Sequence, residues 1–479
     1  MTVLSGQLET LRRIQPMRIG GTVAALRGLT LLVDELPLPV GSLVSVGDGG
    51  ARGGDAPARP ARALGEVVGF DQGRAIVMLL GQTAGIRAGD RVCGEQAAQT
   101  APVGARLLGR VIDGLGRPID GKGPVHETSA RPLCPPPVSA MKRRRITRPL
   151  HTGIRAVDLM TTLGRGQRMG IFSGPGVGKS TLLGCIARSG RADVNVIALI
   201  GERGREVGDF IAHSLGAEGL AKSVLVVATS DESPLMRIRA ALVACAAAEF
   251  FRDRGDDVLL MMDSVTRFAH AQRQVGLSVG EPPATKGYTP SVFAMLPLLL
   301  ERAGATERGS ITGLYTILVE GDDLTEPIAD AARGILDGHI ILSRRIAQRA
   351  HYPAIDVLDS VSRVAEEVCD PHHKAARAQV VRLLAAYRDI EELVQIGAYA
   401  PGSNPEADVA IEYRARILDL LRQGREERAG FEEARSVMVR IALEAGEALR
   451  RRMAVPAVPR PAGGGTGGAG GGGGAGHRS

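Results

Sequence analysis

The stretch Arg168-Met-Gly-Ile-Phe-Ser-Gly-Pro-Gly-Val-Gly-Lys-Ser-Thr181 decides the fold. It begins with the short apolar run Met169–Phe172, continues into a glycine-rich turn and leads into a segment of helical pattern. Glycines let backbone N–H groups wrap around phosphates without a Cβ in the way, and the positive end of the following helix points at the same oxygens. The sequence therefore predicts a nucleotide-phosphate site formed by Gly174, Pro175, Gly176, Val177, Gly178, Lys179, Ser180 and Thr181.

Two residues of this loop carry the predicted chemistry. Lys179 would reach the β- and γ-phosphates, and the Ser180 hydroxyl would ligate Mg²⁺. The strict pattern asks for Gly where this chain has Ser173, but a small residue there still permits the turn. The alternative is a glycine-rich turn whose lysine is solvated, and the order of strand, loop and helix argues against it.

Outside the loop, the character of the sequence changes three times along the chain. Residues 17–95 contain short β-rich segments between turns, which is typical of a small β-barrel. From about residue 165 apolar strands buried on both faces alternate with helices, and past residue 374 apolar residues recur at helical spacing. We predict an α/β fold, a phosphate-loop NTPase core with a parallel sheet (RecA-like), preceded by a small β-barrel and followed by a helical domain. The expected domains are the barrel at 1–98, the nucleotide-binding catalytic domain at 99–374, the helical domain at 375–455 and a flexible glycine-rich tail at 456–479.

Acidic residues at the ends of two predicted strands are candidates for the chemistry. Asp263 follows the fully apolar run Val258–Met262, where it could hold the Mg²⁺ water shell or simply cap the next helix. Glu202 follows the strand Val194–Ile200, where ligands of open α/β folds gather. There it could orient the attacking water while Arg203 offsets phosphate charge, or both could belong to a solvated salt-bridge patch.

Charge and composition limit the classes of partner. The net charge is +7, but the arginine-rich stretches at 141–157 and 448–479 contain no acid and together exceed that value, so the rest of the chain is net acidic. Aromatic residues make up 3%, with no Trp, which disfavours a base-stacking nucleic-acid surface. Five scattered cysteines without a C-x-x-C pair indicate a reducing cytoplasm rather than a disulfide framework. The acidic partner best supported is a nucleoside triphosphate, and no nucleic acid is expected.

At these residues the chain resembles the catalytic subunits of rotary ATPases, and within that superfamily the ATPases of type III protein export. The likeness runs from about residue 18 to 450. The segment Glu281-Pro-Pro-Ala-Thr-Lys-Gly-Tyr288 is more similar to flagellar export ATPases than to those of virulence secretion. The other segments that carry it are Leu163–Gly170, the phosphate loop, Gly201–Glu206, Met262–Arg267 and His351–Asp356.

The resemblance implies a role for each matching residue, with ATP and Mg²⁺ as cofactors. Lys179 and Ser180 match the phosphate and Mg²⁺ residues, Asp263 the metal-site acid and Glu202 the catalytic glutamate. Arg203 and Arg267 match arginines near the γ-phosphate. Tyr352 matches the aromatic residue that stacks on adenine, with a core aromatic beside a proline turn as the alternative. Arg363 matches the arginine finger that a neighbouring subunit supplies.

The resemblance further implies an ATP-hydrolysing motor of flagellar type III export, which releases and unfolds substrates and delivers them to the membrane export gate. Expected partners are a homohexamer, a coiled-coil regulator at the N-terminus, a central stalk protein, export gate membrane proteins and chaperone–substrate complexes. The location would be cytoplasmic, with peripheral association at the inner membrane. Alternatives are an injectisome ATPase, the catalytic subunit of a proton-coupled ATP synthase, a hexameric RNA translocase and a scaffold that binds ATP without turnover. Residues 1–95 contain only Phe70 among the aromatics, which argues against the RNA translocase.

Two further segments have open interpretations. Leu4, Leu8 and Leu11 could form one face of a regulator-docking helix, or the terminus could fray or pack on the barrel. The basic run Lys142–Arg145 could contact anionic lipid or could be a solvated linker. The loop at 48–62 and the glycine-rich tail have no role that the family suggests.

Overall fold

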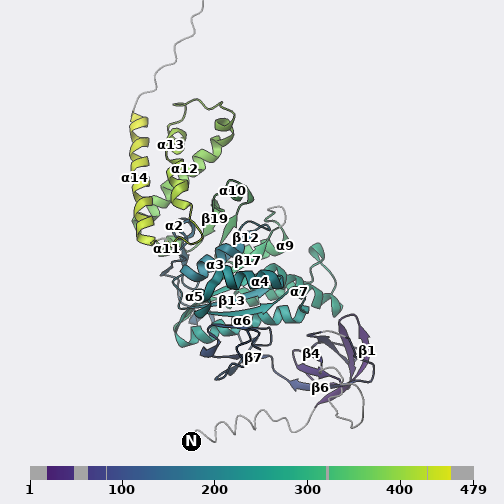
Figure 1. The fold of residues 1–479 in the computed structure, drawn as a ribbon. Coiled ribbons are helices and arrows are strands. Elements are labelled where there is room, and N and C mark those ends of the chain that lie inside the picture. The colour runs from purple at the N-terminus through teal and green to yellow at the C-terminus, as the bar shows by residue number, and fades with distance from the viewer. Residues whose placement is uncertain (1–18, 48–62, 82–83, 320–322, 429, 455–479) are drawn as a thin grey trace, which may run out of the picture.

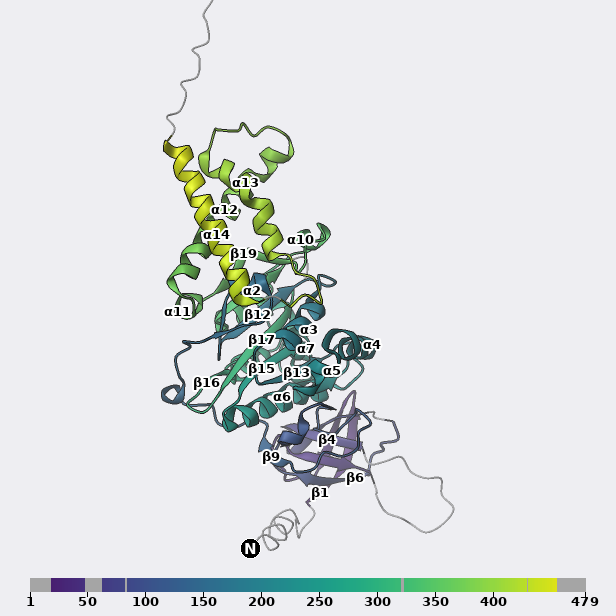
Figure 2. The ribbon, with the colours of Figure 1, turned by 60° about the vertical axis from the view of Figure 1, so that its left-hand side comes forward.

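The computed structural model describes residues 19–47, 63–81, 84–319, 323–428 and 430–454. Three parts follow one another along the molecule, with a small barrel at one end, a large sheet with helices in the middle and a helical domain at the other end (Figures 1 and 2). This arrangement confirms the predicted fold class. Two predicted features, the leucines near the N-terminus and the glycine-rich tail, lie outside the described residues, as does the loop at 48–62.

The N-terminal part is a closed antiparallel barrel in which the last strand returns to the first. Its interior is filled by buried aliphatic side chains such as Leu31, Val44, Val67 and Val77, because alternate residues of each strand face inward. The strands, in the order in which they pair around the barrel, are β1 (Gly20–Arg27), β2 (Thr30–Asp34), β5 (Arg74–Leu79), β4 (Ala63–Asp71), β3 (Leu43–Val46) and β6 (Arg91–Gln96).

The central sheet is parallel apart from its edge strand β19 and the short β16, which pairs with β17. Across the sheet the order is β19 (Ile355–Ser362), β18 (Gly338–Leu342), β12 (Arg168–Ser173), β17 (Ser310–Leu318), β15 (Asp257–Asp263), β13 (Val194–Ile200), β14 (Ser223–Ala228) and β8 (Arg110–Ile112), with β16 (Gly304–Ala305) beside β17.

Helices cover both faces of this sheet, and β13 shows why the strand sequences are continuously apolar. All seven of its residues are buried. Val196 and Ala198 belong to the core on the side of α6 (Pro234–Arg254), whereas Ile197 and Leu199 belong to the core on the side of α3 (Lys179–Ser189). Since successive side chains point to opposite faces, a strand covered on both sides needs an apolar residue at every position.

The remaining helices of the middle part lie around these layers; α7 packs against α6, and α8 packs against α7. They are α2 (Arg155–Met160), α4 (Gly204–Asp209), α5 (Gly216–Ala221), α7 (Val265–Ser278), α8 (Pro290–Leu300), α9 (Pro327–Ile335), α10 (Arg344–Gln348) and α11 (Ala365–Val368). Short pieces complete the chain: β7 (Thr100–Val103), β9 (Ser129–Pro132), β10 (Pro149–Leu150), β11 (Leu163–Gly164), the 3₁₀ turns Ala105–Leu107, Ala140–Lys142 and Thr285–Gly287, and the π-helical turn Phe210–Leu215.

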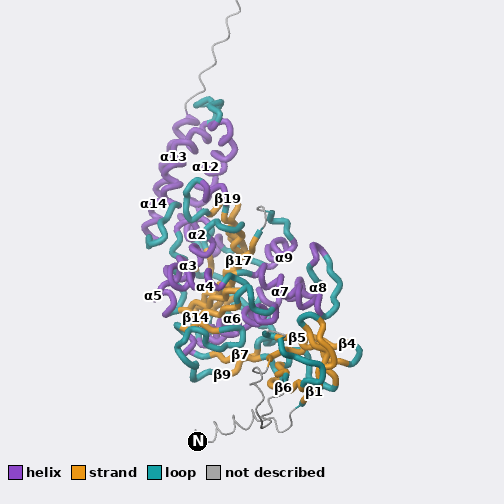
Figure 3. Tube along the Cα trace, turned by 45° about the vertical axis from the view of Figure 1, so that its right-hand side comes forward, coloured by secondary structure: helices purple, strands orange, loops and turns teal. Residues whose placement is uncertain are grey.

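The C-terminal part is made of helices and loops alone (Figure 3). It contains α12 (Pro371–Gln395), α13 (Pro405–Leu421) and α14 (Phe431–Ala454). The Asp370 carboxylate caps α12 by accepting from the His372 and His373 backbone N–H groups, and proline at the first position suits a helix start. The domain boundary predicted at 374/375 therefore lies inside the first turn of α12. No helix among the described residues is long and apolar enough to cross a membrane.

The basic run Lys142–Arg145, which follows the barrel in the sequence, is tied to the central sheet at two of its residues. The Arg143 guanidinium donates to the Ala303 carbonyl at 3.0 Å and to the Glu301 carbonyl at 2.6 Å. The Arg144 N–H donates to the Ala305 carbonyl at 3.0 Å. The Arg145 side chain, by contrast, is 84% exposed. The run is thus a strap along the short strand β16 rather than a wholly solvated linker.

Candidate nucleotide-hydrolysis site

The glycine-rich loop connects the end of β12 to the start of α3, as the sequence predicts. Gly176 and Gly178 adopt φ values of +77° and +97°, a region that side chains with a Cβ disfavour. Val177 is buried and anchors the loop, whereas Pro175, Gly176, Ser180 and Thr181 are exposed. The loop therefore presents its backbone and two hydroxyl groups outward at the N-terminal end of α3, where N–H groups are free to bind an anion.

Three charged side chains meet beside this loop. The strands β12, β13 and β15 are in one parallel sheet, so their carboxyl ends reach the same edge, and Leu199 pairs directly with Asp263. The Lys179 ammonium lies 2.6 Å from Asp263 Oδ1 and 3.5 Å from Glu202 Oε1. The structure thus brings together the predicted phosphate lysine, the predicted metal-site acid and the predicted catalytic glutamate.

The electrostatics of this cluster keep Lys179 charged and make Glu202 a stronger base. Burial disfavours the Lys179 charge, but the carboxylates of Asp263 and Glu202 outweigh it and raise the Lys179 pKa above its ordinary value. Burial raises the pKa of Glu202, and the positive charge of Lys179 opposes that rise. A phosphate group that took over Lys179 would remove this opposing charge from Glu202.

Two arginines near Glu202 are placed differently. The Arg267 side chain passes under Gly201, where a Cβ built on the glycine would lie 3.1 Å from Arg267 Cγ, and its charge acts on Glu202. The Arg203 side chain is 82% exposed, with Glu206 at 3.6 Å as its ion-pair partner. Arg267 therefore belongs to the cluster, and Arg203 faces away from it toward the surface of this chain.

The structure adds residues that the sequence analysis missed. The Thr316 hydroxyl on β17 donates to Asp263 Oδ1 at 2.8 Å and so orients that carboxylate. Arg237, at the start of α6, is close enough to Arg267 for the two positive charges to interact, and burial with this repulsion lowers the Arg237 pKa. A threonine inside an apolar strand next to the loop strand is a signal that could have pointed to Thr316.

Tyr352 lies beside the phosphate loop although it is far away in sequence. A Cβ built on Gly178 would lie 4.0 Å from Tyr352 Cε1, and the tyrosine side chain is 49% exposed. The Tyr352 carbonyl accepts from the backbone N–H of Gln423, which follows α13, so the C-terminal domain is tied to this position. An exposed aromatic ring next to a phosphate loop is a suitable face for a nucleobase.

Arg363 lies at the opposite edge of the sheet from the loop. Strand β19 runs antiparallel to β18, with Ile355 paired to Leu342 near the loop and Ser362 paired to Gly338 at the far end. Seven residues of strand separate those two positions, which corresponds to about 23 Å. An arginine side chain is much shorter than this, so the exposed Arg363 side chain cannot reach the loop of its own chain.

Comparisons with known proteins agree with this geometry. The chain matches the nucleotide-binding domain of the ATP synthase alpha/beta family at residues 153–362, the β-barrel domain of that family at 40–94 and the C-terminal domain of the type III secretion ATPase EscN at 369–440. It is 52% identical to the flagellum-specific ATP synthase of Treponema pallidum over 88% of this chain and 93% of the relative. It is also 52% identical to the type 3 secretion system ATPase of Xanthomonas euvesicatoria over 78% of this chain and 85% of that protein.

Solved structures give the same result. The assembled ATPase EscN of the enteropathogenic E. coli type III secretion system superposes with a TM-score of 0.81 at 41% identity, covering 88% of this chain and all of EscN. EscN in complex with its central stalk EscO superposes with a TM-score of 0.80 at 40% identity, over 88% of this chain and all of that one. The chain belongs to the ATP synthase alpha/beta family, in the branch of flagellar and type III secretion ATPases, and is an ATP-hydrolysing enzyme. The resemblance seen in the sequence is thereby confirmed.

Proposed function

We propose that this chain hydrolyses Mg-ATP to drive flagellar protein export, with Glu202 as the residue that activates water. The observation that carries the proposal is the meeting of Lys179, Glu202 and Asp263 at one edge of the sheet. Each of these residues comes from a different strand end, and the fold brings them within a few ångströms of one another. A solvated surface patch would not bury two carboxylates around one ammonium.

Each residue contributes a separate part of the chemistry. The phosphate loop, residues 174–181, surrounds the phosphates with N–H groups, and Lys179 turns from Asp263 to the β- and γ-phosphates. Ser180 and Asp263 provide oxygen donors that suit Mg²⁺, which would neutralise charge on the phosphates. Glu202 accepts a proton from the attacking water, and Arg267 stabilises the charge that develops on the γ-phosphate.

A second subunit supplies the arginine finger, the group that this site still needs for hydrolysis. Arg363 faces outward at the other edge of the sheet, so it fits the active site of a neighbouring chain in a homohexamer. The structure of the assembled relative EscN supports such an arrangement. ATPase activity per chain should then rise steeply with protein concentration. A constant specific activity down to a demonstrated monomer would refute the trans role of Arg363.

The proposed partners follow from the family. The complex of EscN with its central stalk supports a stalk protein in the centre of the ring. The export gate, chaperone–substrate complexes and a coiled-coil regulator at the N-terminus complete the set, at the cytoplasmic side of the inner membrane. The strong similarity to the Xanthomonas secretion ATPase makes an injectisome the second candidate. Restoration of motility in a flagellar ATPase deletion strain would separate the two.

The role of Glu202 is tested by Glu202→Gln. The amide keeps the size of the side chain but cannot accept the proton, so kcat should fall by about 10²–10⁴-fold while ATP binding is retained. Asp209→Asn is the matched control, because Asp209 is an exposed acid on the adjacent helix α4, with Arg205 as its ion-pair partner. Turnover of Glu202→Gln near the wild-type rate would refute the assignment.

A further inference from the structure

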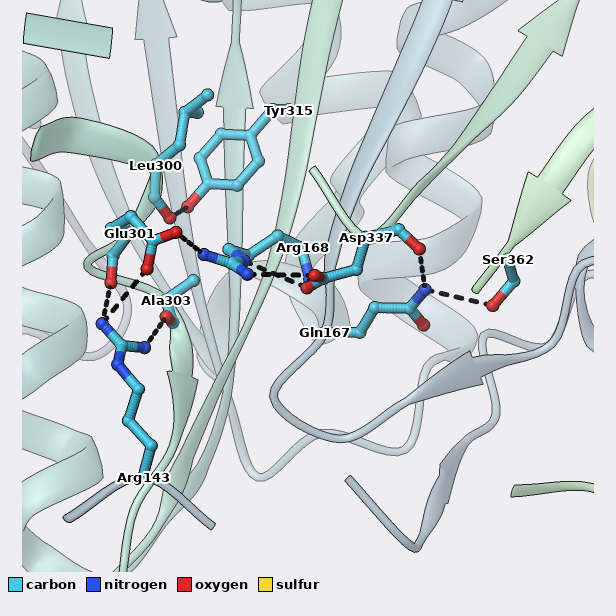
Figure 4. A network of polar contacts seen from close by, with 9 residues as sticks. All are labelled: Arg143, Gln167, Arg168, Leu300, Glu301, Ala303, Tyr315, Asp337 and Ser362. Atoms are coloured by element: carbon cyan, nitrogen blue, oxygen red, sulfur yellow. Dashed lines mark hydrogen bonds and ion pairs between the residues drawn. The ribbon is translucent and has the colours of Figure 1, made fainter. Parts of the chain in front are cut away.

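A network of polar contacts links Asp337 and Ser362 to Gln167 and Arg168 (Figure 4). It also fixes the backbone of the next residue, Arg363, whose side chain is exposed. The Arg363 N–H donates to the Asp337 carbonyl at 2.9 Å. Within the part of the chain that the structure describes, the Arg363 guanidinium has no ion pair or hydrogen bond. The residue is therefore held by its main chain and presents an unpaired positive charge outward.

Asp337 is itself held by several hydrogen bonds with Arg168. Its carboxylate accepts from the Arg168 backbone N–H at 3.0 Å, from Nε at 3.0 Å and from Nη2 at 2.9 Å. Its own N–H donates to the Arg168 carbonyl at 2.8 Å. Planar, bidentate pairing of this kind fixes orientation as well as distance. The Asp337 carbonyl, which accepts the hydrogen bond from the Arg363 N–H, therefore has a fixed direction.

A buried glutamine joins the same carbonyl to the residue before Arg363. Gln167 is fully buried, and its Nε2 donates to the Asp337 carbonyl at 3.1 Å and to Ser362 Oγ at 3.0 Å. Ser362 Oγ in turn donates to the Thr162 carbonyl at 2.8 Å. Ser362, the last residue of β19, and Arg363, which follows it, are thus attached to the start of β12 through the Gln167 amide and the Asp337 carbonyl.

The network continues to the basic run Lys142–Arg145, which lies along β16. Arg168 also forms an ion pair with Glu301, at the end of α8. Glu301 lies 3.5 Å from the Arg143 guanidinium, which additionally donates to its carbonyl. The Arg168 guanidinium, which orients Asp337, is therefore itself held by Glu301 at the end of α8. The two carboxylates of Asp337 and Glu301 raise the pKa of Arg168, although burial opposes this rise.

We propose that Asp337 and Arg168 are positioning residues for Arg363, which fix the direction in which it enters the active site of the neighbouring subunit. This inference rests on the proposed trans role of Arg363. Neither residue touches the nucleotide site of its own chain, since both lie at the opposite edge of the sheet. Their effect on turnover is transmitted through the backbone at residues 362–363 alone.

Asp337→Asn tests the proposal. The asparagine keeps the backbone carbonyl but turns one carboxylate oxygen into an N–H₂ group that faces Arg168, so the grip loosens. A displacement of about 1 Å at a reacting group can cost about 100-fold, so we expect kcat to fall about 10- to 100-fold. KM for ATP and the concentration at which rings assemble should change less than about two-fold, because the chain's own site is untouched.

The chain offers a closely matched control on β8, the outermost strand on the other side of the sheet from β19. Asp120 accepts from Arg110 Nε at 2.7 Å and from Arg110 Nη2 at 2.9 Å, which is the same fork. It also accepts from two backbone donors, the Val111 N–H at 3.1 Å and the Lys122 N–H at 3.0 Å. Arg110 begins β8, the strand farthest from β19. Asp120→Asn should therefore lower the melting temperature to a similar extent but leave kcat close to wild type.

A double-mutant cycle decides whether Asp337 acts through Arg363. If it does, Asp337→Asn added to Arg363→Ala lowers kcat no further, and Arg168→Lys, which keeps the charge but loses the fork, behaves in the same way. Multiplied effects, an unchanged kcat in a folded Asp337→Asn ring, or an equal loss in Asp120→Asn would overturn the inference. A wild-type rate for Arg363→Ala would instead refute the trans mechanism on which it rests.

Discussion

Substitution of Gly201 is the sharpest test of the charged cluster around Glu202. Gly201 follows β13 directly and precedes Glu202, with a φ of +71°. A Cβ built there would lie 2.9 Å from Arg267 Cβ, 3.1 Å from Cγ and 3.3 Å from Cδ. Ordinary contacts between such carbons are about 3.5–4.0 Å, so either Arg267 or the turn that carries Glu202 must move by about 1 Å.

The magnitude of the Gly201→Ala effect follows from two costs. Placing alanine in the left-handed region costs about 1–2 kcal/mol, and forcing a methyl group into a filled space costs about 1–3 kcal/mol more. The unfolding free energy should therefore fall by about 2–5 kcal/mol. A displacement of about 1 Å at Glu202 or Arg267 should reduce kcat about 100-fold in the protein that remains folded.

Gly204→Ala is the control for this prediction. Gly204 starts helix α4 three residues later, and no heavy atom lies within 4 Å of the position its Cβ would take. Alanine there should leave kcat unchanged and stabilise the helix by about 0.5–1 kcal/mol. The assay is steady-state ATP turnover together with thermal unfolding followed by circular dichroism. A folded Gly201→Ala with more than half of wild-type kcat, or an equal loss in both variants, would refute the reasoning.

Three other changes have defined outcomes. The buried Glu66 carboxylate of the barrel lies 2.8 Å from the Arg239 guanidinium of α6. Arg239→Ala leaves that carboxylate without its charge partner, so the unfolding free energy measured in urea should fall by about 3–5 kcal/mol. A loss below about 1 kcal/mol would contradict this. Tyr352→Ala should weaken ATP binding in equilibrium titrations by about 1–3 kcal/mol while Tyr352→Phe binds normally, since stacking needs only the ring; equal affinities for all three proteins would exclude stacking. Burial raises the pKa of Asp158 from 3.8 to about 6, so its contribution to stability is greatest below pH 3.8 and is lost as the pH rises through 6. Asp158→Asn should consequently gain up to about 3 kcal/mol of unfolding free energy relative to wild type between pH 4 and pH 7 in urea titrations, and a pH-independent difference would contradict the shift.

The sequence was sufficient for those parts of the site that depend on short stretches of chain. The loop before Lys179 and the strand ends before Glu202 and Asp263 are local patterns, and parallel pairing then forces the strand ends to one edge of the sheet. The strand Val194–Ile200 was predicted with the bounds that the structure gives to β13. These successes share a cause, because strands covered on both faces leave an unbroken apolar signal.

Strand β17 was missed because it breaks that signal. Besides Tyr315, three of its residues carry hydroxyl groups, yet all three are buried and bonded: Ser310 to Asp257, Thr312 to the Gly166 N–H and Thr316 to Asp263. Each partner lies on another strand or loop, so the polar residues become compatible with a central strand only in the folded sheet. Burial of a hydroxyl group is favourable only when it finds such a partner, and no local pattern reports this.

The opposite placement of Tyr352 and Arg363 was likewise invisible in the sequence. Eleven residues separate them, and in a helix they would lie about 16 Å apart with no fixed relation to the loop. Because β19 pairs antiparallel to β18, Tyr352 ends beside Gly178 and Arg363 ends beside Asp337, at opposite edges of the sheet. Under the proposed trans role of Arg363, β19 would connect two nucleotide sites, because Tyr352 precedes the strand at the site of its own chain and Arg363 follows it at the end directed away from that site. A change in the tilt of β19 would therefore act on both sites at once, which gives a physical route by which neighbouring subunits in a ring could hydrolyse ATP in sequence.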